Sequence, residues 1–261
     1  MGRTADVEDR SEDAFLGGRL NITQPTTGHR AGLDAILLAA SCPVDEGQSI
    51  ADLGAGVGVA GLAVLKRQPG CQLTLVEQDP LLVDLCRGNA TNNGFASQTQ
   101  AIEATIGGKG GAEAAGLQAG SFHHVIANPP FAAPGTGRMS PDARKRAAHQ
   151  LDESGLEPWF RWAAGLLETG GTFTLIHEPA ALGHLLSLSD TRFGGVVVVP
   201  IQPRSHEAAH RIILQGVKGS RAALSIAPPL ILHDHKGSGY TPQVEDILRN
   251  AKPIPISRRN G

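Results

Sequence analysis

The sequence predicts an α/β fold built on a doubly wound, mostly parallel sheet of seven strands. From Ser49 onward, short apolar runs alternate with stretches of helical periodicity, a pattern typical of parallel strands joined by helices. A glycine-rich turn at residues 52–58 joins the first of these strands to the first helix. Near the carboxyl end, residues 195–201 and 211–217 have no helix between them, so we expect them to pair as an antiparallel hairpin.

The individual elements follow from the same periodicities. We expect strands at residues 49–53, 72–77, 98–103, 122–127 and 172–177, and a strand-like segment at 229–233. We expect helices at residues 57–67, 80–92, 156–167 and 242–250. Pro80 suits a first helical turn, and Asn93-Gly94 suits a left-handed helix end. The Gly- and Ala-rich residues 107–120 predict an irregular loop that contains a short helix.

The chain divides into three parts. Residues 1–13 are polar and are expected to form a disordered tail. Residues 14–47 form a leader, with two short strands around Gly17-Gly18 and a helix over residues 32–40. The leader is too short to enclose a core, so it must pack on the main domain, residues 48–261.

Composition excludes several classes of protein. The net charge of −2 gives no overall basic field of the kind that attracts polyanions, although a local patch could do so. The three cysteines, Cys42, Cys71 and Cys86, lack the paired spacing of a disulfide framework or a zinc site. The polar start is not a secretory signal and no apolar run could span a membrane, which predicts a soluble, cytoplasmic protein.

The glycine turn is the first candidate binding site. Glycines at a strand-to-helix turn let backbone N–H groups approach a ligand at the positive end of the helix. Residues 56–61 also fit the dinucleotide fingerprint, with Glu77 at about the right distance. Glycine spacing alone therefore does not distinguish a dinucleotide cofactor from S-adenosylmethionine. Asp52 precedes the first glycine, where it would repel a pyrophosphate and attract a sulfonium or ammonium group. This favours S-adenosylmethionine over a nicotinamide cofactor.

The second candidate site is Asn128-Pro129-Pro130-Phe131, which ends the strand at residues 122–127. Two prolines stop the strand and stiffen the chain, because neither can donate to a sheet ladder. The result is a corner with an amide oxygen, unblocked backbone carbonyls and an aromatic ring. Such a corner suits a planar amine. The carbonyl oxygens accept its N–H protons, and the aromatic ring stacks on its flat face.

Together these motifs resemble class I S-adenosylmethionine-dependent N-methyltransferases, a resemblance that covers residues 49–177. It implies a Rossmann-like fold and a catalytic corner made of Asn128, Pro129, Pro130 and Phe131. It also implies a set of cofactor-binding residues, with Glu77 on the ribose hydroxyls: Asp52, Gly54, Gly56, Gly58, Glu77, Gln78, Glu103 and Asn128. Two positions depart from the pattern: Thr105, in place of Glu103, could face the adenine, and His123 stands where Asp is common.

A narrower resemblance covers nearly the whole chain. Residues 15–20 and 28–34, together with residues 211–219 and 228–233, are similar to the bacterial tRNA (adenine-N6)-methyltransferases that modify the adenine beside a valine tRNA anticodon. The resemblance implies a tRNA partner and methyl transfer to an adenine amine. Phe131 would stack on the base, and a cluster that includes Arg138, Arg144 and Lys145 either contacts phosphates or is a solvated surface.

Several alternatives stay open. Methylation of a protein glutamine amide uses the same acceptor geometry, and residues 56–61 leave room for a nicotinamide-dependent oxidoreductase. A non-catalytic binding module is a further option, which an intact catalytic corner argues against. Asp34 and Asn89 belong either to the cofactor cleft or to plain helix surfaces. His233-Asp234-His235 lacks a nearby third ligand, so no metal is expected.

Overall fold

The first strand of the main domain lies inside the sheet, with a parallel neighbour on each side. The computed structural model describes residues 10–28, 30–130, 155–234, 237 and 239–256. Five parallel strands form one end of the sheet: β3 (Ser49–Leu53), β4 (Gln72–Glu77), β5 (Thr99–Glu103), β6 (Phe122–Ala127) and β7 (Leu167–His177). Because β3 lies between β4 and β6, the carboxyl ends of these strands meet at one edge.

The remaining strands extend the sheet beyond β7. The predicted hairpin is confirmed, since β9 (Arg211–Lys218) runs antiparallel to both β7 and β8 (Phe193–Gln202). The described sheet has nine strands in the order β10-β8-β9-β7-β6-β3-β4-β5, with β11 also paired to β8. The two strands beyond the predicted seven are short pieces at the β8 edge, β10 (Ser225–Ile226) and β11 (Leu230–Ile231).

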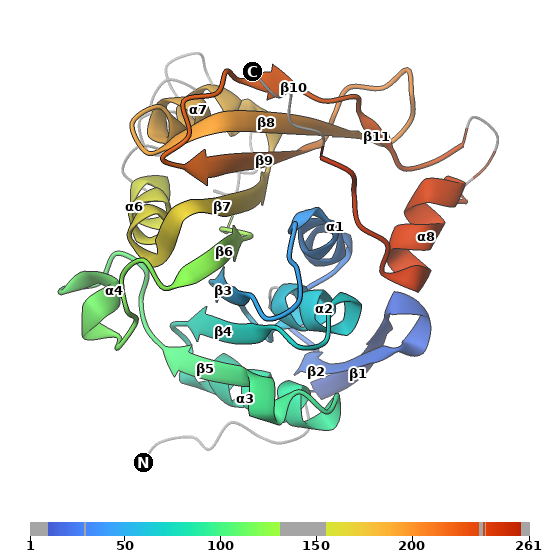
Figure 1. Cartoon of the computed structure of the whole chain (residues 1–261). Helices are drawn as coiled ribbons and strands as arrows, with labels where there is room; N and C mark the ends of the chain where they lie inside the picture. Colours follow the sequence, from blue (N-terminus) through green and yellow to red (C-terminus); the bar gives the residue numbers. More distant parts are fainter. Residues whose placement is uncertain (1–9, 29, 131–154, 235–236, 238, 257–261) are drawn as a thin grey trace, which may run out of the picture.

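Helices cover both faces of the sheet, as the alternating pattern predicted (Figure 1). One face is covered by α1 (Leu33–Ser41), α2 (Val59–Arg67), α3 (Pro80–Asn92) and α8 (Pro242–Asn250). The other face is covered by α6 (Leu156–Leu166) and α7 (Leu182–Ser189), beside the short helix α4 (Gly111–Ala114). Strand residues alternate between the two cores, so that Ile50 packs on the first face and Ala51 on the second. Across the ranges described, no helix is long and apolar enough to cross a membrane.

The leader forms a separate hairpin that packs on the first face. It consists of β1 (Arg10–Phe15) and β2 (Leu20–Pro25), which pair antiparallel with register Phe15 to Leu20. Leu20 and Ile22 are fully buried and anchor this hairpin in the core shared with α1 and α2. The prediction of a tail over residues 1–13 was wrong at its end, because residues 10–13 belong to β1. The side chains of residues 10–13 are all polar or charged, and they alternate between exposed and half-buried positions. The sequence therefore has no apolar pattern here that would predict a strand.

Candidate active site

A cleft of about 460 Å³ opens at the carboxyl ends of β3, β4 and β6. Pockets of about 300–1,000 Å³ are the size that holds a cofactor or a small ligand. The predicted residues that line it come from the glycine turn, the end of β4 and the Asn-Pro-Pro corner: Asp52, Gly54, Gly56, Glu77, Gln78, Asn128 and Pro130. Three sequence-distant motifs therefore share one cavity.

The glycine turn forms the floor of the cleft because its backbone is left-handed. Gly54, Gly56 and Gly58 have φ of +65°, +58° and +90°, a region that side chains with a Cβ rarely adopt. A Cβ added at Gly54 would lie 2.4 Å from a ring carbon of Trp159, so the indole packs directly on this glycine. Gly58 is not among the residues that line the cleft; a Cβ there would meet Leu75 and Cys86 in the core. Gly58 thus shapes the turn just before α2 begins.

Glu77 is held at the end of β4 by backbone donors. Its Oε2 accepts a hydrogen bond from the N–H of Gly56 at 2.9 Å. Its Oε1 accepts from the N–H groups of Gln78 at 2.8 Å and Asp79 at 3.0 Å. Each carboxylate oxygen has two lone-pair sites, so the group is oriented and keeps acceptor capacity for a ligand hydroxyl.

Asp52 is a buried acid beneath the glycine turn. Its side chain is almost fully buried, and Oδ2 accepts a hydrogen bond from the N–H of Gly61 at 2.9 Å. Burial raises the pKa of Asp52 to about 7; the Gly61 hydrogen bond opposes this shift and the charge of Glu77 adds to it. A cation bound in the cleft would therefore favour the charged form of Asp52.

The raised pKa of Asp52 predicts a pH dependence of stability. Between pH 3.8, the ordinary pKa of an aspartate, and pH about 7, the folded protein binds a proton at Asp52 that the unfolded chain has lost. The free energy of unfolding therefore falls by roughly 4 kcal/mol as pH rises through this window. Asp52→Asn keeps an acceptor for Gly61 and removes this fall, so at pH 8 the variant is expected to be the more stable protein. Urea unfolding of both proteins at pH 5 and pH 8 checks this, and parallel pH profiles would contradict it.

Asn128 has an unsatisfied acceptor at the edge of the cleft. Its Oδ1 is buried and has no hydrogen-bond partner within the described part of the chain. Pro129 is buried and Pro130 is exposed, and neither proline has a backbone N–H. Because buried carbonyl oxygens are normally paired, this one is ready to accept a donor from a ligand. The corner offers acceptors and no backbone donor from either proline.

Some predicted site residues lie elsewhere or outside the described ranges. Glu103 ends β5 opposite Glu77, but Glu103 and Thr105 are both exposed, and Ala104 and Ile106 line the cleft instead. The role of Glu103 stays a prediction. Asp34 does not line the cleft and pairs with Arg211 at 2.8 Å. The expected substrate contacts lie outside the described residues: Phe131, Arg138, Arg144 and Lys145.

The structure adds cleft residues that the sequence did not indicate. Trp159 and Pro158, from the start of α6, form one wall, and Ala31 and Ala35, from the leader, form another. An aromatic residue in an amphipathic helix reads as core, so only the fold reveals that Trp159 covers Gly54. Among the described residues, no group of three or more His, Cys, Asp or Glu side chains gathers in a metal-binding arrangement.

Comparison with known proteins defines the class to which this fold and cleft belong. Residues 31–184 match the model of the methyltransferase small domain, and the chain belongs to this family of methyltransferases. A predicted O-methyltransferase from Agrobacterium tumefaciens has a similar structure, with a TM-score of 0.72 and 33% sequence identity. That match covers 85% of this chain and 98% of the other.

Curated relatives have a more specific name. The tRNA1(Val) (adenine(37)-N6)-methyltransferase of Shewanella sp. (strain MR-4) is 29% identical over 202 residues, which are 77% of this chain and 83% of the relative. The enzyme of the same name from Haemophilus influenzae (strain 86-028NP) is 27% identical over 69% of this chain and 74% of its own length. These names agree with the narrower resemblance that residues 15–20, 28–34, 211–219 and 228–233 indicated.

Proposed function

We propose that this methyltransferase moves the methyl group of S-adenosyl-L-methionine to the exocyclic N6 amine of an adenine in tRNA. The observation that carries the proposal is the buried Oδ1 of Asn128, which has no partner among the described residues and lies in the same cleft as Glu77 and the glycine turn. Support for the substrate comes from the names of the curated relatives. The cytoplasm, where such a substrate is found, stays a prediction for the location of this chain.

The cleft fits an adenosyl cofactor on its own chemistry. Glu77 offers oriented carboxylate oxygens for the ribose hydroxyls. Leu82, Ala104 and Ile106 supply apolar surface for a flat base beside the end of β4. Asp52 lies under the glycine turn, where its negative form attracts a positively charged sulfonium. When bound, the cofactor supplies a methyl group on this sulfonium.

Asn128 and Pro129 act on the amine that receives the methyl group. The lone pair of an adenine amine is delocalised into the ring, which makes it a poor nucleophile. Hydrogen bonds from its N–H groups to Asn128 Oδ1 and the Pro129 carbonyl favour the pyramidal nitrogen that develops in the transition state. Asn128 and Pro129 would hold this nitrogen towards the methyl group that the bound cofactor would supply, and one N–H proton would leave to water after the transfer. No strong base is needed before the attack.

The corner favours an amine over a hydroxyl as acceptor of the methyl group. An amine has two N–H donors for the two carbonyl oxygens, whereas a hydroxyl has one O–H and would leave a buried carbonyl unpaired. The Agrobacterium structure is named as an O-methyltransferase, so the acceptor atom must be tested directly. Phe131 as a stacking ring and the cluster with Arg138, Arg144 and Lys145 as phosphate contacts stay predictions.

Methyl transfer from labelled S-adenosylmethionine to separate extracts of tRNA, rRNA and protein tests the proposal. We expect label in tRNA. Label in protein alone would contradict the tRNA substrate and favour a protein glutamine amide, while the assignment of the cofactor would stand. Calorimetric titration with S-adenosylhomocysteine and with NAD is the matched control, and binding of NAD alone would restore the oxidoreductase alternative.

A further inference from the structure

Two asparagines, Asn89 in α3 and Asn93 at the cap that follows α3, hold the leader hairpin on the main domain. Asn89 Oδ1 accepts from the backbone N–H of Thr23 at 2.8 Å, and Asn89 Nδ2 donates to the Thr23 carbonyl at 3.0 Å. Asn93 makes the same pair of hydrogen bonds to Asn21, at 3.0 and 2.7 Å. Four residues of helix rise about 6 Å and two residues of strand about 6.8 Å, so the two side chains match alternate residues of β2.

Only one of these asparagines also bonds to a residue that lines the cofactor cleft. Nδ2 of Asn89 donates a second hydrogen bond, at 3.0 Å, to the carbonyl of Val57, which lines the cleft within the glycine turn. The corresponding second bond of Asn93 goes to the carbonyl of Asn89 in its own helix, at 2.8 Å. Asn89 is 1% exposed, so water cannot replace its bonds. The two residues therefore differ in one connection, the bond to the glycine turn.

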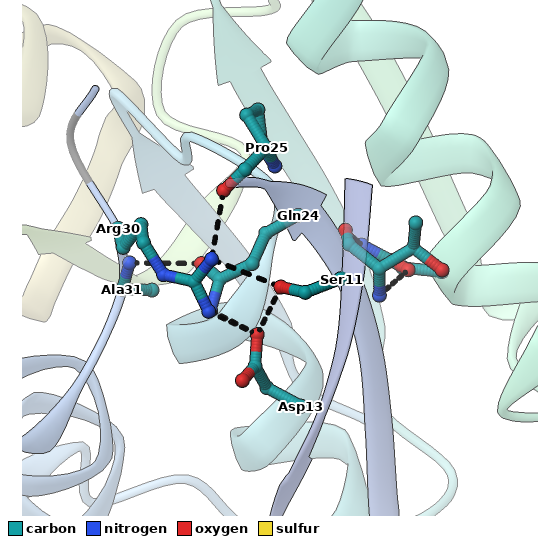
Figure 2. A network of polar contacts seen from close by, with 8 residues as sticks. Ser11, Asp13, Gln24, Pro25, Arg30 and Ala31 are labelled. Atoms are coloured by element: carbon teal, nitrogen blue, oxygen red, sulfur yellow. Dashed lines mark hydrogen bonds and ion pairs between the residues drawn. The ribbon is translucent and has the colours of Figure 1, made fainter. Parts of the chain in front are cut away.

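The leader itself forms part of the cleft wall. Figure 2 shows the Arg30 guanidinium facing three groups of the hairpin: Asp13 Oδ2 at 2.6 Å, Ser11 Oγ at 2.9 Å and the Pro25 carbonyl at 3.0 Å. Beside it, the side chain of Gln24 accepts from the N–H of Ala31 at 3.1 Å, and Ala31 lines the cleft. The hairpin thus fixes one wall, while Asn89 ties the same hairpin to the glycine turn opposite.

We propose that Asn89 is a positioning residue for the cofactor, which couples the docked leader hairpin to the glycine turn through the carbonyl of Val57. The inference rests on the cofactor assigned under the proposed function. Asn89 touches no part of the substrate and does not line the cleft. It fixes the backbone of the turn, so its loss affects how well the cofactor binds and leaves the chemical step of the bound complex intact.

The test compares Asn89→Ala with the matched control Asn93→Ala. Both variants remove the side-chain bonds to β2, and hydrogen exchange of the Asn21 and Thr23 amides reports the loosened hairpin. We expect the calorimetric Kd for S-adenosylhomocysteine to rise about tenfold in Asn89→Ala, the equivalent of one lost hydrogen bond, and to change little in Asn93→Ala. The KM for S-adenosylmethionine should rise with Kd, while kcat at saturation is retained.

Two results would overturn the proposal: an unchanged Kd in Asn89→Ala, or equal rises in both variants, which would place the effect in the hairpin alone. If Asn89→Ala does not fold, Asn89→Ser serves in its place with the same two outcomes, since its short hydroxyl cannot bridge the Thr23 backbone and the Val57 carbonyl as the amide does. Failure of the wild-type protein to bind S-adenosylhomocysteine would instead overturn the proposed function.

Discussion

Replacement of Asn128 by alanine is expected to lower kcat for methyl transfer by about 10²–10³-fold, the range seen when one preorganised hydrogen-bonding group is lost at a reacting centre. The variant loses the buried Oδ1, which has no partner among the described residues and is assigned to the amine under the proposed function. Glu77 and the glycine turn are untouched, because their hydrogen bonds do not involve Asn128. Steady-state kinetics together with calorimetric titration of S-adenosylhomocysteine measures the two effects separately.

Asn128→Asp is the matched control for this prediction. Aspartate has nearly the same shape and keeps an acceptor oxygen at the corner, so it should retain far more activity than alanine. Affinity for S-adenosylhomocysteine should fall far less than kcat in the alanine variant. If Asn128→Ala transfers methyl at the wild-type rate, or loses activity only because the cofactor no longer binds, then Asn128 does not act on the amine.

Replacement of Gly54 by alanine is expected to destabilise the protein by about 2–5 kcal/mol and to weaken cofactor binding. The left-handed φ of +65° costs an alanine about 1–2 kcal/mol, and forced overpacking costs about 1–3 kcal/mol more. The overpacking arises because the new methyl would lie 2.4 Å from the Trp159 ring, which lines the cleft. Urea unfolding and cofactor titration measure the two effects.

Gly56→Ala separates the two costs. Gly56 has a similar φ of +58°, but its added Cβ would have no neighbour within 4 Å in the described structure. It should therefore show the backbone cost without the clash. Gly54→Ala should therefore cost less in a Trp159→Ala background than in the wild-type protein, because the clash is absent there. Equal destabilisation by the two glycine variants would mean that Trp159 does not pack on Gly54.

The local signals predicted the elements around the cofactor cleft well. β4 has the bounds 72–77 that its apolar run predicted, and α3 has the predicted bounds 80–92. Pro80 occupies the first turn of α3, and the Asp79 side chain caps it by accepting from the N–H of Leu81 at 2.9 Å. Signals of this kind act within a few residues, so a sequence is enough to read them.

The parts that were missed depend on contacts between distant residues. The polar strand β1 is stabilised by pairing with β2 and by Arg30 across the hairpin, and neither interaction leaves an apolar pattern. Trp159 covers Gly54 from 105 positions away in the sequence, counted from the residue numbers 54 and 159, and no local rule links them. The sequence was equally consistent with Asn89 on a helix surface and with Asn89 in the cofactor cleft. Its three bonds to Thr23 and Val57 are visible only in the fold.

The identity of the methylated nucleoside tests the central claim most directly. After transfer from labelled S-adenosylmethionine, the labelled tRNA is digested to nucleosides and separated by chromatography. The acceptor corner at Asn128 predicts that the label elutes with N6-methyladenosine, because that exocyclic nitrogen offers its N–H protons to the carbonyls. Label on a ribose oxygen, as in a 2′-O-methyl nucleoside, would contradict the claim.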